Sequence, residues 1–266
     1  MIKFFRHIRM RLLNNNRFSK YLLYAVGEII LVVAGILIAL QVNNWNSGRL
    51  DKVEEKVILR SLLNEFNINF SELDIAMKNR EKGLNGSKEL LALMNTDISH
   101  LSTDYLDELI GLSRYITTFE PKTGILEGII NSGRLDLIEN VDLRNELASW
   151  TGALDDLQKV ELDQSNIIIN LYNPYLSKNL TIRNSNVKAI EVLFSDSKHV
   201  WEKWHPSVNT THNLDYQKVF SDPEFESLIS NINVWRIGCY VRSENLHTKI
   251  KEIIALIENE IEEVET

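Results

Sequence analysis

The stretch best suited to chemistry is "HVWEKWHPSVNTTH", in the second half of the chain. Its histidines, His199, His205 and His212, are six and seven residues apart, with Glu202 between the first two. Dedicated zinc sites usually place paired ligands two to five residues apart, so we expect no metal here. Trp201 and Trp204 are interpreted as packing residues. The alternative is that Trp201, Trp204 and His205 contact a partner or a ligand, because exposed indoles favour interfaces.

The remaining reactive groups also favour structural roles. Cys239 is the only cysteine, so an internal disulfide is impossible, and its place on an apolar helix face predicts a buried thiol. Gly124-x-x-x-Gly128 lacks the other residues of a phosphate-binding loop and predicts close helix packing. The sequence contains neither a nucleophile elbow nor a zinc-protease helix motif. We therefore expect no enzyme and no cofactor.

Glu28 lies inside the apolar run "YLLYAVGEIILVVAGILIALQV", Tyr21–Val42, which contains no other formal charge. Twenty-two residues of helix span roughly 33 Å, close to the hydrocarbon thickness of a bilayer. A soluble core helix of this length would show a polar stripe, and a cleaved signal would have a shorter apolar core and a small-x-small cleavage site. The run predicts an uncleaved transmembrane helix over residues 20–44, with the lipid bilayer as its first partner.

Tyr24, Glu28, Gly35 and Ala39 fall on one face of this predicted helix. Small residues beside a polar one allow a second helix to approach closely and to hydrogen-bond. The face therefore predicts self-association or docking to another membrane protein. The alternative is a tolerated carboxyl that stays protonated or reaches the near interface.

Charge sets the expected orientation. Residues 1–20 contain six Lys or Arg and no acid, so the net charge of -8 divides into +6 for this arm and -14 for the rest. An acidic body would repel phosphate, so we expect no nucleic-acid partner. The positive-inside rule predicts a basic cytoplasmic segment over residues 1–19 and an extracytoplasmic domain over residues 45–266. The protein is then expected to be a single-pass membrane protein with a large extracytoplasmic domain.

Apolar residues at steps of three and four predict an all-α domain, because strand alternation is nowhere sustained. A first long helix starts near Leu50 and presents one apolar face: Leu59, Leu62, Phe66, Phe70, Leu73 and Met77. We expect it to end at "KGLNGS", residues 82–87, because Gly83 and Gly86 are stop signals. Shorter helices are expected at residues 87–94, 103–115 and 123–130, and a longer one from Asn140 to Pro174.

Asp222-Pro223-Glu224 predicts the start of a long final helix, since it combines a cap, a proline and an early acid. Its near-heptad stripe has Arg242 as the one polar position on the seam. The apolar members of the stripe are Leu228, Ile232, Trp235, Cys239, Leu246, Ile250, Ile253 and Ile257. The predicted fold is therefore an N-terminal transmembrane helix followed by an antiparallel helical bundle, in which the long first and last helices pair in coiled-coil fashion.

Two blocks of the sequence resemble an uncharacterised family of single-pass membrane proteins of Bacteroidota. They are "NRFSKYLLYAVGEIILVVAGILIALQVNNWN" and "FEPKTGILEGIINSGRLDLIENVDLRNELASW". The resemblance implies a bacterial inner-membrane protein with an extracytoplasmic helical domain. It implies no activity, so no catalytic residue can be transferred from it.

Two functions fit these features. The first is a membrane-anchored helical scaffold or interaction protein of the cell envelope that binds another protein or itself. The second is an extracytoplasmic sensory or ligand-binding module that signals through a partner protein, since the cytoplasmic arm is too short to hold an output domain. An enzyme ranks third, because no catalytic motif is present.

Overall fold

The computed structural model describes residues 18–204 and 214–265. The chain divides into two compact units, one ending at Val57 and the other beginning at Ile58. Throughout the described residues the regular structure is helical, which confirms the predicted all-α class. Residues 1–17, 205–213 and 266 lie outside this description.

The first unit contains the N-terminal part of helix α2 (Phe18–Leu93). Between Ala25 and Val42 its side chains are exposed or nearly so, although most of them are apolar. The helix includes an 18-residue window of mean hydropathy 2.4, none of which is buried inside the structure. By length and composition this helix could cross a membrane, and a signal sequence would pass the same test. A core helix would be buried, so that explanation does not hold for this segment.

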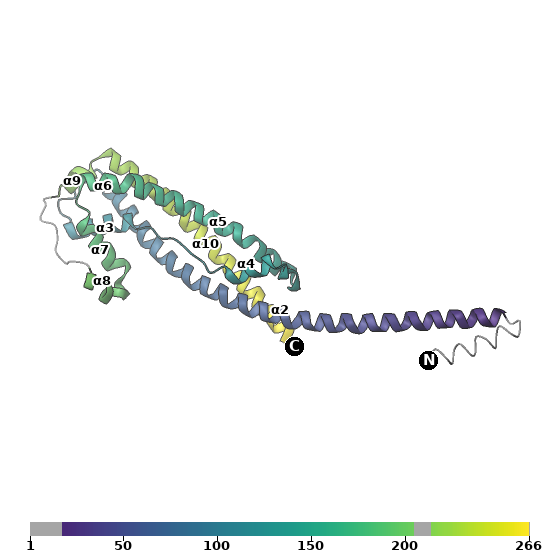
Figure 1. Ribbon diagram of the computed structural model, residues 1–266. Coiled ribbons are helices and arrows are strands. Elements are labelled where there is room, and N and C mark those ends of the chain that lie inside the picture. Colours follow the sequence, from purple (N-terminus) through teal and green to yellow (C-terminus); the bar gives the residue numbers. More distant parts are fainter. Residues whose placement is uncertain (1–17, 205–213, 266) are drawn as a thin grey trace. The chain divides into compact units, whose positions relative to one another are not determined.

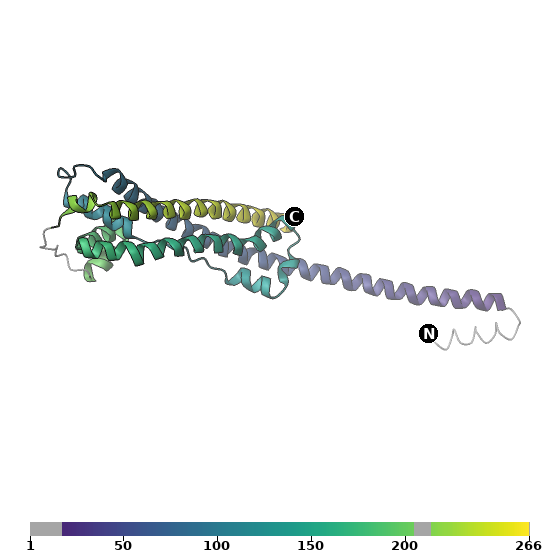
Figure 2. The same ribbon diagram turned by 90° about the horizontal axis from the view of Figure 1, so that it is seen from above.

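In the second unit, three long helical segments run side by side (Figures 1 and 2). They are the part of α2 from Ile58 onward, α5 (Val141–Ile167) and α10 (Pro223–Glu265). Contacts between α2 and α10 run in opposite chain directions, because Phe70 stacks on His247 whereas Ser87 bonds to Asn233. The predicted antiparallel pairing of the long first and last helices is confirmed.

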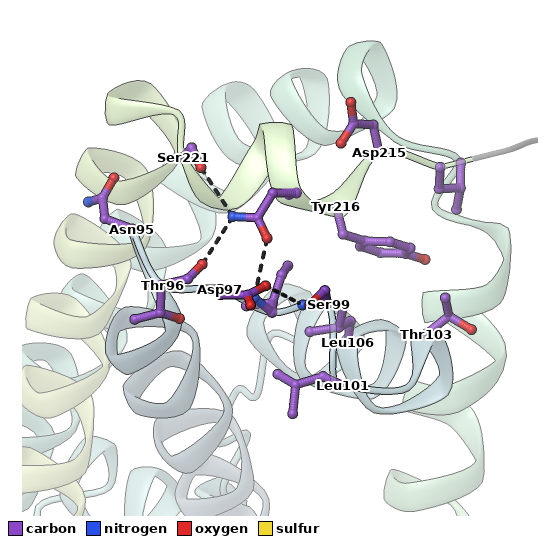
Figure 3. A pocket seen from close by; sticks show the side chains of 13 residues that line it. Asn95, Thr96, Asp97, Ser99, Leu101, Thr103, Leu106, Asp215, Tyr216 and Ser221 are labelled. Carbon is purple, nitrogen blue, oxygen red and sulfur yellow. Dashed lines mark hydrogen bonds between the residues drawn. The ribbon is translucent and has the colours of Figure 1, made fainter.

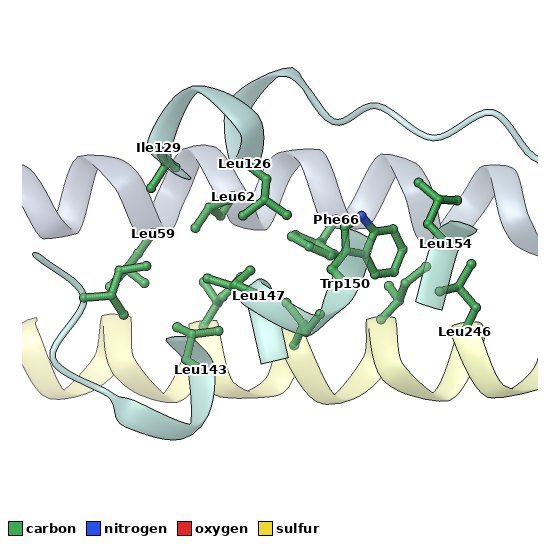
Figure 4. Close-up of a cluster of buried hydrophobic side chains, with 14 of the residues drawn as sticks. Leu59, Leu62, Phe66, Leu126, Ile129, Leu143, Leu147, Trp150, Leu154 and Leu246 are labelled. Atoms are coloured by element: carbon green, nitrogen blue, oxygen red, sulfur yellow. The ribbon is translucent and has the colours of Figure 1, made fainter. Parts of the chain in front are cut away.

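One apolar cluster fills the space between these three segments near the start of the second unit (Figure 4). Leu59, Leu62 and Phe66 of α2 meet Leu246 and Ile250 of α10. Leu143, Leu147 and Trp150 of α5 close the third side, and Leu126 and Ile129 of α4 (Gly124–Asn131) cover the cluster. The Trp150 ring meets the Phe66 ring edge-on at a centroid distance of 5.2 Å. Full burial of such large rings is the main source of stability for this end of the bundle.

A second apolar cluster lies where shorter helices pack against the bundle. The Phe225 ring, at the start of α10, is surrounded by the rings of Tyr172, Tyr175 and Phe220. These residues belong to the π-helical turn η2 (Ile168–Tyr172), α6 (Asn173–Asn179) and α9 (Tyr216–Phe220). Helix α3 (Thr103–Arg114) adds Leu106, Leu109 and Ile110.

The helix boundaries agree with the sequence pattern where a strong cap is present. Ser102 and Asn140 cap α3 and α5 through side-chain oxygens, and α10 begins at Pro223 as predicted. Helices α3 and α4 match the expected short helices to within one residue at each end. After α6 the chain forms α7 (Arg183–Leu193), the 3-10 turn η3 (Ser195–Ser197) and α8 (Lys198–Trp204). A further 3-10 turn, η1 (Arg134–Leu137), follows Gly133, whose φ of 70° suits glycine.

Two predicted helix ends were wrong. Helix α2 does not end at residues 82–87 but continues to Leu93, so the separate helix expected at residues 87–94 is its last part. The helix expected to end at Pro174 continues through η2 into α6. Proline has no N–H to donate to the carbonyl four residues earlier, and the wider π turn absorbs this loss. In that turn the Asn173 N–H bonds to the Ile168 carbonyl, five residues back.

The buried seam of α10 also differs from the prediction: it passes through Ser243, one residue after the predicted polar position Arg242. Arg242 is not fully buried; its Nε donates to Asp156 on the neighbouring α5 at 2.9 Å. The buried polar residues of α10 are Arg236, Ser243 and Glu260. The seam, at regular steps of three and four, is Ile229, Ile232, Arg236, Cys239, Ser243, Leu246, Ile250, Ile253, Ile257 and Glu260.

Gly83 owes its place to this buried arginine. A β-carbon built at Gly83 would lie 1.8 Å from Nη1 of Arg236. Glycine therefore leaves the space in α2 that the guanidinium occupies. The helix continues through Gly83, because glycine lacks a side chain but keeps its backbone N–H and C=O groups.

The packing of the first cluster predicts that truncating either Phe66 or Ile250 to alanine lowers the unfolding free energy by about 2–5 kcal/mol, because both side chains are fully buried. Equilibrium denaturation of the full chain in detergent, followed by circular dichroism, measures the change. Ile75→Ala is the matched control on α2, since Ile75 is 60% exposed and should cost less than about 0.5 kcal/mol. Equal losses for Phe66 and Ile75 would contradict the assigned packing.

The steric gap predicts that Gly83→Ala destabilises the protein by about 1–3 kcal/mol, because the added methyl group displaces a buried, hydrogen-bonded guanidinium. Gly152→Ala is the control: nothing lies within 4 Å of a β-carbon there, so replacing glycine within α5 should stabilise by up to about 1 kcal/mol. In an Arg236→Met background the cost of Gly83→Ala should shrink, and a double-mutant cycle measures the coupling. Purely additive effects would show that the two residues do not compete for space.

Candidate functional site

The predicted interaction face of the N-terminal segment is exposed on α2. Glu28, Gly35 and Ala39 are all exposed, and nothing lies within 4 Å of a β-carbon built at Gly35. Tyr24 is part of the same helix, but its side chain lies outside the description. Among the described residues of the first unit, no other element covers this face of α2.

The tryptophan and histidine residues proposed as contacts lie in and after α8. Trp201 and Trp204 belong to this helix, and their side chains are not described, whereas His205 and His212 fall outside the described residues altogether. His199 is exposed. Within the described ranges, no group of three or more His, Cys, Asp or Glu residues is arranged to hold a metal ion.

A layer of buried polar side chains separates the two apolar clusters. Each long helix contributes at the same level: Arg80 and Ser87 from α2, Glu161 and Gln164 from α5, and Arg236, Cys239 and Ser243 from α10. Along each helix, one apolar cluster ends before these residues and the other begins after them. The layer is thus a distinct part of the interior. Of its residues, the sequence pattern predicted only Cys239 to be buried.

Arg80 and Glu161 form the ionic part of this layer. The Arg80 guanidinium pairs with the Glu161 carboxylate, and its Nη1 also donates to the Cys239 carbonyl at 3.4 Å. The carboxylate accepts a second bond, 3.2 Å long, from the backbone N–H of Phe119. Burial raises the pKa of Glu161, and the Arg80 charge opposes that rise. Such a pair specifies how α2 and α5 align, because removing one partner would leave a buried charge.

Arg236 has no carboxylate partner in the described structure and is held by backbone instead. Its Nη2 donates to the carbonyls of Ser113 at 2.8 Å, Tyr115 at 3.0 Å and Leu112 at 3.4 Å, all at the C-terminal end of α3. A helix C-terminus has a partial negative charge and unsatisfied carbonyls, so it suits a cation. Burial lowers the pKa of Arg236 to about 10, which leaves it charged at neutral pH.

Cys239 in the same layer is an unreactive thiol. Its Sγ donates to Oε1 of Gln164 at 3.0 Å, and burial raises its pKa to about 11. The thiolate is the nucleophilic form, so a buried and protonated thiol does not act as a nucleophile. This geometry suits the structural role predicted for it.

A hollow on the second unit lies between α9 and the loop that links α2 to α3 (Figure 3). It has a volume of about 660 Å³, and its walls include Asn95, Thr96, Ser99, Tyr216 and Gln217. The Gln217 amide bridges the loop: Nε2 donates to the Thr96 carbonyl at 3.0 Å, and Oε1 accepts from the Ile98 N–H at 3.2 Å. These hydrogen bonds hold the loop onto α9, so the hollow lies at a structural junction.

A buried carboxylate lies beside this hollow. Asp107 of α3 is 2% exposed, and its Oδ1 accepts a hydrogen bond of 2.8 Å from the hydroxyl of Tyr216 on α9. Burial raises the pKa of Asp107, although the bonds from Tyr216 and Asn184 oppose the rise. Sequence reasoning missed this pair, because nothing in the spacing of residues 107 and 216 indicates that they meet.

Comparisons with known proteins identify one domain. Residues 28–152 match the model of a family of unknown function, DUF6090. The match includes all of the second block quoted above and the first block from Glu28 onward. The predicted resemblance to an uncharacterised family is confirmed in this general form, while its taxonomic range stays a prediction. No curated protein and no solved structure matches the chain.

Asp107 predicts a specific pH dependence of stability. A raised pKa in the folded state means that stability is fully present below the unfolded value, near 3.8, and declines as the pH rises through the folded pKa. Asp107→Asn keeps an acceptor for Tyr216 and removes the charge, so the variant should be more stable than the natural chain at pH 8 and equal to it near pH 3.5. Denaturant unfolding at several pH values measures this difference. A gap that is constant across this range would contradict the assignment.

Proposed function

We propose that this chain is a membrane-anchored helical interaction protein, which self-associates through one face of α2 and presents the helical domain as a scaffold. In this proposal residues 20–44 cross the inner membrane of a bacterium, with the N-terminus in the cytoplasm and the domain in the periplasm. The six basic residues before the span support this orientation. We assign it no catalytic activity and no cofactor.

The observation that carries the proposal is an exposed apolar face that extends beyond the expected span. Leu50, Val53 and Val57 are 55%, 61% and 59% exposed. Their spacing of three and four residues places them on one side of α2. A soluble helix surface seldom presents such a stripe to water, and these residues follow the segment that lipid would cover.

This stripe continues the face predicted within the apolar segment. At about 100° per residue, Gly35, Ala39 and Val42 lie on the same side of α2 as Leu50 and Val53. This face, with Asn46 between Val42 and Leu50, therefore joins small residues inside the expected bilayer to larger apolar residues outside it. In lipid, small residues allow two helices to approach closely, whereas in water the larger apolar residues favour association.

A second copy of the chain is the partner that this face fits. Copies in one membrane share an orientation, so their α2 helices run parallel and each residue lies opposite its own counterpart. Gly35 and Ala39 then meet small residues at the same depth, and Leu50 and Val53 meet apolar residues at the same height. The steps of three and four between Leu50 and Val57 are those of a coiled coil.

A ligand-binding module that acts through a partner protein is the second candidate. The observation that favours it is a small cavity between α3 and α7 with an arginine in its wall. Self-association and ligand binding use different parts of the chain, so either can hold without the other.

Self-association predicts face-specific crosslinking in membranes. In a Cys239→Ser background, which keeps a donor for Gln164, we expect Ala39→Cys and Val53→Cys to form disulfide-linked dimers upon mild oxidation. Leu37→Cys and Asp51→Cys are matched controls on the other side of the same helix and should crosslink far less. Non-reducing gel electrophoresis of isolated membranes gives the readout. Equal crosslinking at all four positions would refute the face.

A further inference from the structure

A cavity of about 350 Å³ opens between α3 and α7, apart from the face of α2 and from the hollow of Figure 3. Gly111, Arg114 and Tyr115 line it from one side, and Ala189, Ile190 and Phe194 from the other. Its volume is at the lower end of the range for small-molecule sites. The cavity would hold one compact group.

Close packing of the two helices keeps the walls in place. A β-carbon at Gly111 would lie 2.2 Å from the Ser185 carbonyl oxygen and 3.0 Å from the Ala189 Cβ. Because these contacts involve backbone atoms, no residue larger than glycine fits at position 111 without moving a helix. Ala189 also lines the cavity, and its small side chain leaves space between α3 and α7. The cavity is thus a product of rigid helix packing.

Arg114 gives the cavity its chemistry. The guanidinium Nε donates to Oδ1 of Asn173 at 2.8 Å, and Nη1 donates to Oδ1 of Asn186. Both partners are neutral amides, and no carboxylate of the described residues forms an ion pair with this side chain. Burial lowers the pKa of Arg114, because the charged form is partly desolvated without a counter-charge. An anion would supply that charge.

Three other cations nearby already have acceptors. Arg236 bonds to the carbonyls at the C-terminal end of α3, and Lys82 donates to the Val192 carbonyl at 3.2 Å. Lys188 on α7 forms ion pairs with Asp104 and Glu191. Arg114 is therefore the cation in this region best placed to receive an anionic ligand.

The remaining walls are apolar. The Tyr115 and Phe194 rings meet edge-on at a centroid distance of 6.0 Å, and Ile190 and Leu193 extend the same surface. An apolar wall next to one guanidinium favours a ligand that has a hydrocarbon part and a single charged end. Arginine presents two parallel N–H groups that match the two oxygens of a carboxylate.

We propose that this cavity binds a small monocarboxylate with an aromatic or branched apolar group, and that Arg114 receives its carboxylate. Tyr115, Phe194 and Ile190 would enclose the apolar group. This proposal names a ligand class for the second candidate function, and it does not depend on self-association.

Calorimetric titration of the full chain in lipid nanodiscs tests the proposal, with empty nanodiscs as the reference. The probes are phenylacetate, benzoate and 4-methylpentanoate, and 2-phenylethanol is an uncharged analogue. We expect saturable binding of one carboxylate per chain, with at least one probe binding about tenfold or more tightly than the alcohol, because a hydrogen bond to a charged group is worth about 1.5–3 kcal/mol. Absence of saturable binding for all three carboxylates would overturn the proposal, as would equal binding of the alcohol.

Variants locate the site. Arg114→Gln should abolish the preference for the carboxylate, and Ala189→Leu should exclude every probe by filling the cavity. Arg183→Gln is the matched control, because Arg183 is an exposed arginine on α7, the helix that forms the opposite wall of the cavity from Arg114. Thermal unfolding of each variant shows whether it is folded, and the comparison of acid with alcohol in the natural chain needs no variant. Unchanged selectivity in a folded Arg114→Gln protein would place the site elsewhere. Binding with no crosslinking at α2 would leave this inference standing and reject self-association alone.

Discussion

The arrangement of the bundle depends on the buried guanidinium of Arg236. It inserts through the gap that Gly83 leaves in α2 and ends on the carbonyls at the C-terminus of α3. One side chain from α10 thus joins three helices at one level. If α10 slid by a heptad, the guanidinium would lose both the space at Gly83 and the carbonyls of α3, and a buried charge without acceptors costs several kcal/mol. The arginine therefore selects one register among several that the apolar stripe alone would allow.

The polar layer also divides the interior into two parts with different character. On the side of the layer that comes earlier along α2, aliphatic side chains and the Phe66–Trp150 pair pack between the three long helical segments. Beyond it, tyrosines, short helices and a π turn surround Phe225, and buried hydroxyls find partners such as Ser113 and Asp107. The first part is a regular coiled-coil-like core. The second part, with its turns and cavities, offers the surfaces that can recognise a ligand.

Periodicity in the sequence predicted the elements whose physics is local. The face of α2 from Leu59 to Leu73 and the start of α10 at Pro223 follow from residue spacing and capping, which nearby residues determine. Gly83 was misread because a glycine that ends a helix and one that admits a distant side chain look the same in sequence. Arg236 could be predicted to be buried, because Ile229, Ile232 and Cys239 define a heptad pattern that includes position 236. The prediction instead placed Trp235 and Arg242 on the seam. The meetings of Asp107 with Tyr216 and of Arg114 with Asn173 depend on tertiary packing and left no local signal.

The contact between Gly83 and Arg236 also constrains the order in which this sequence can change over time. While Arg236 is present, a side chain at position 83 collides with its guanidinium, so replacing Gly83 costs stability. Once a shorter apolar residue replaces the arginine, the same position becomes open to alanine, and a return to arginine then carries that cost. The same two substitutions therefore differ in cost according to the order in which they occur. The interior of this bundle favours one order of divergence over the other.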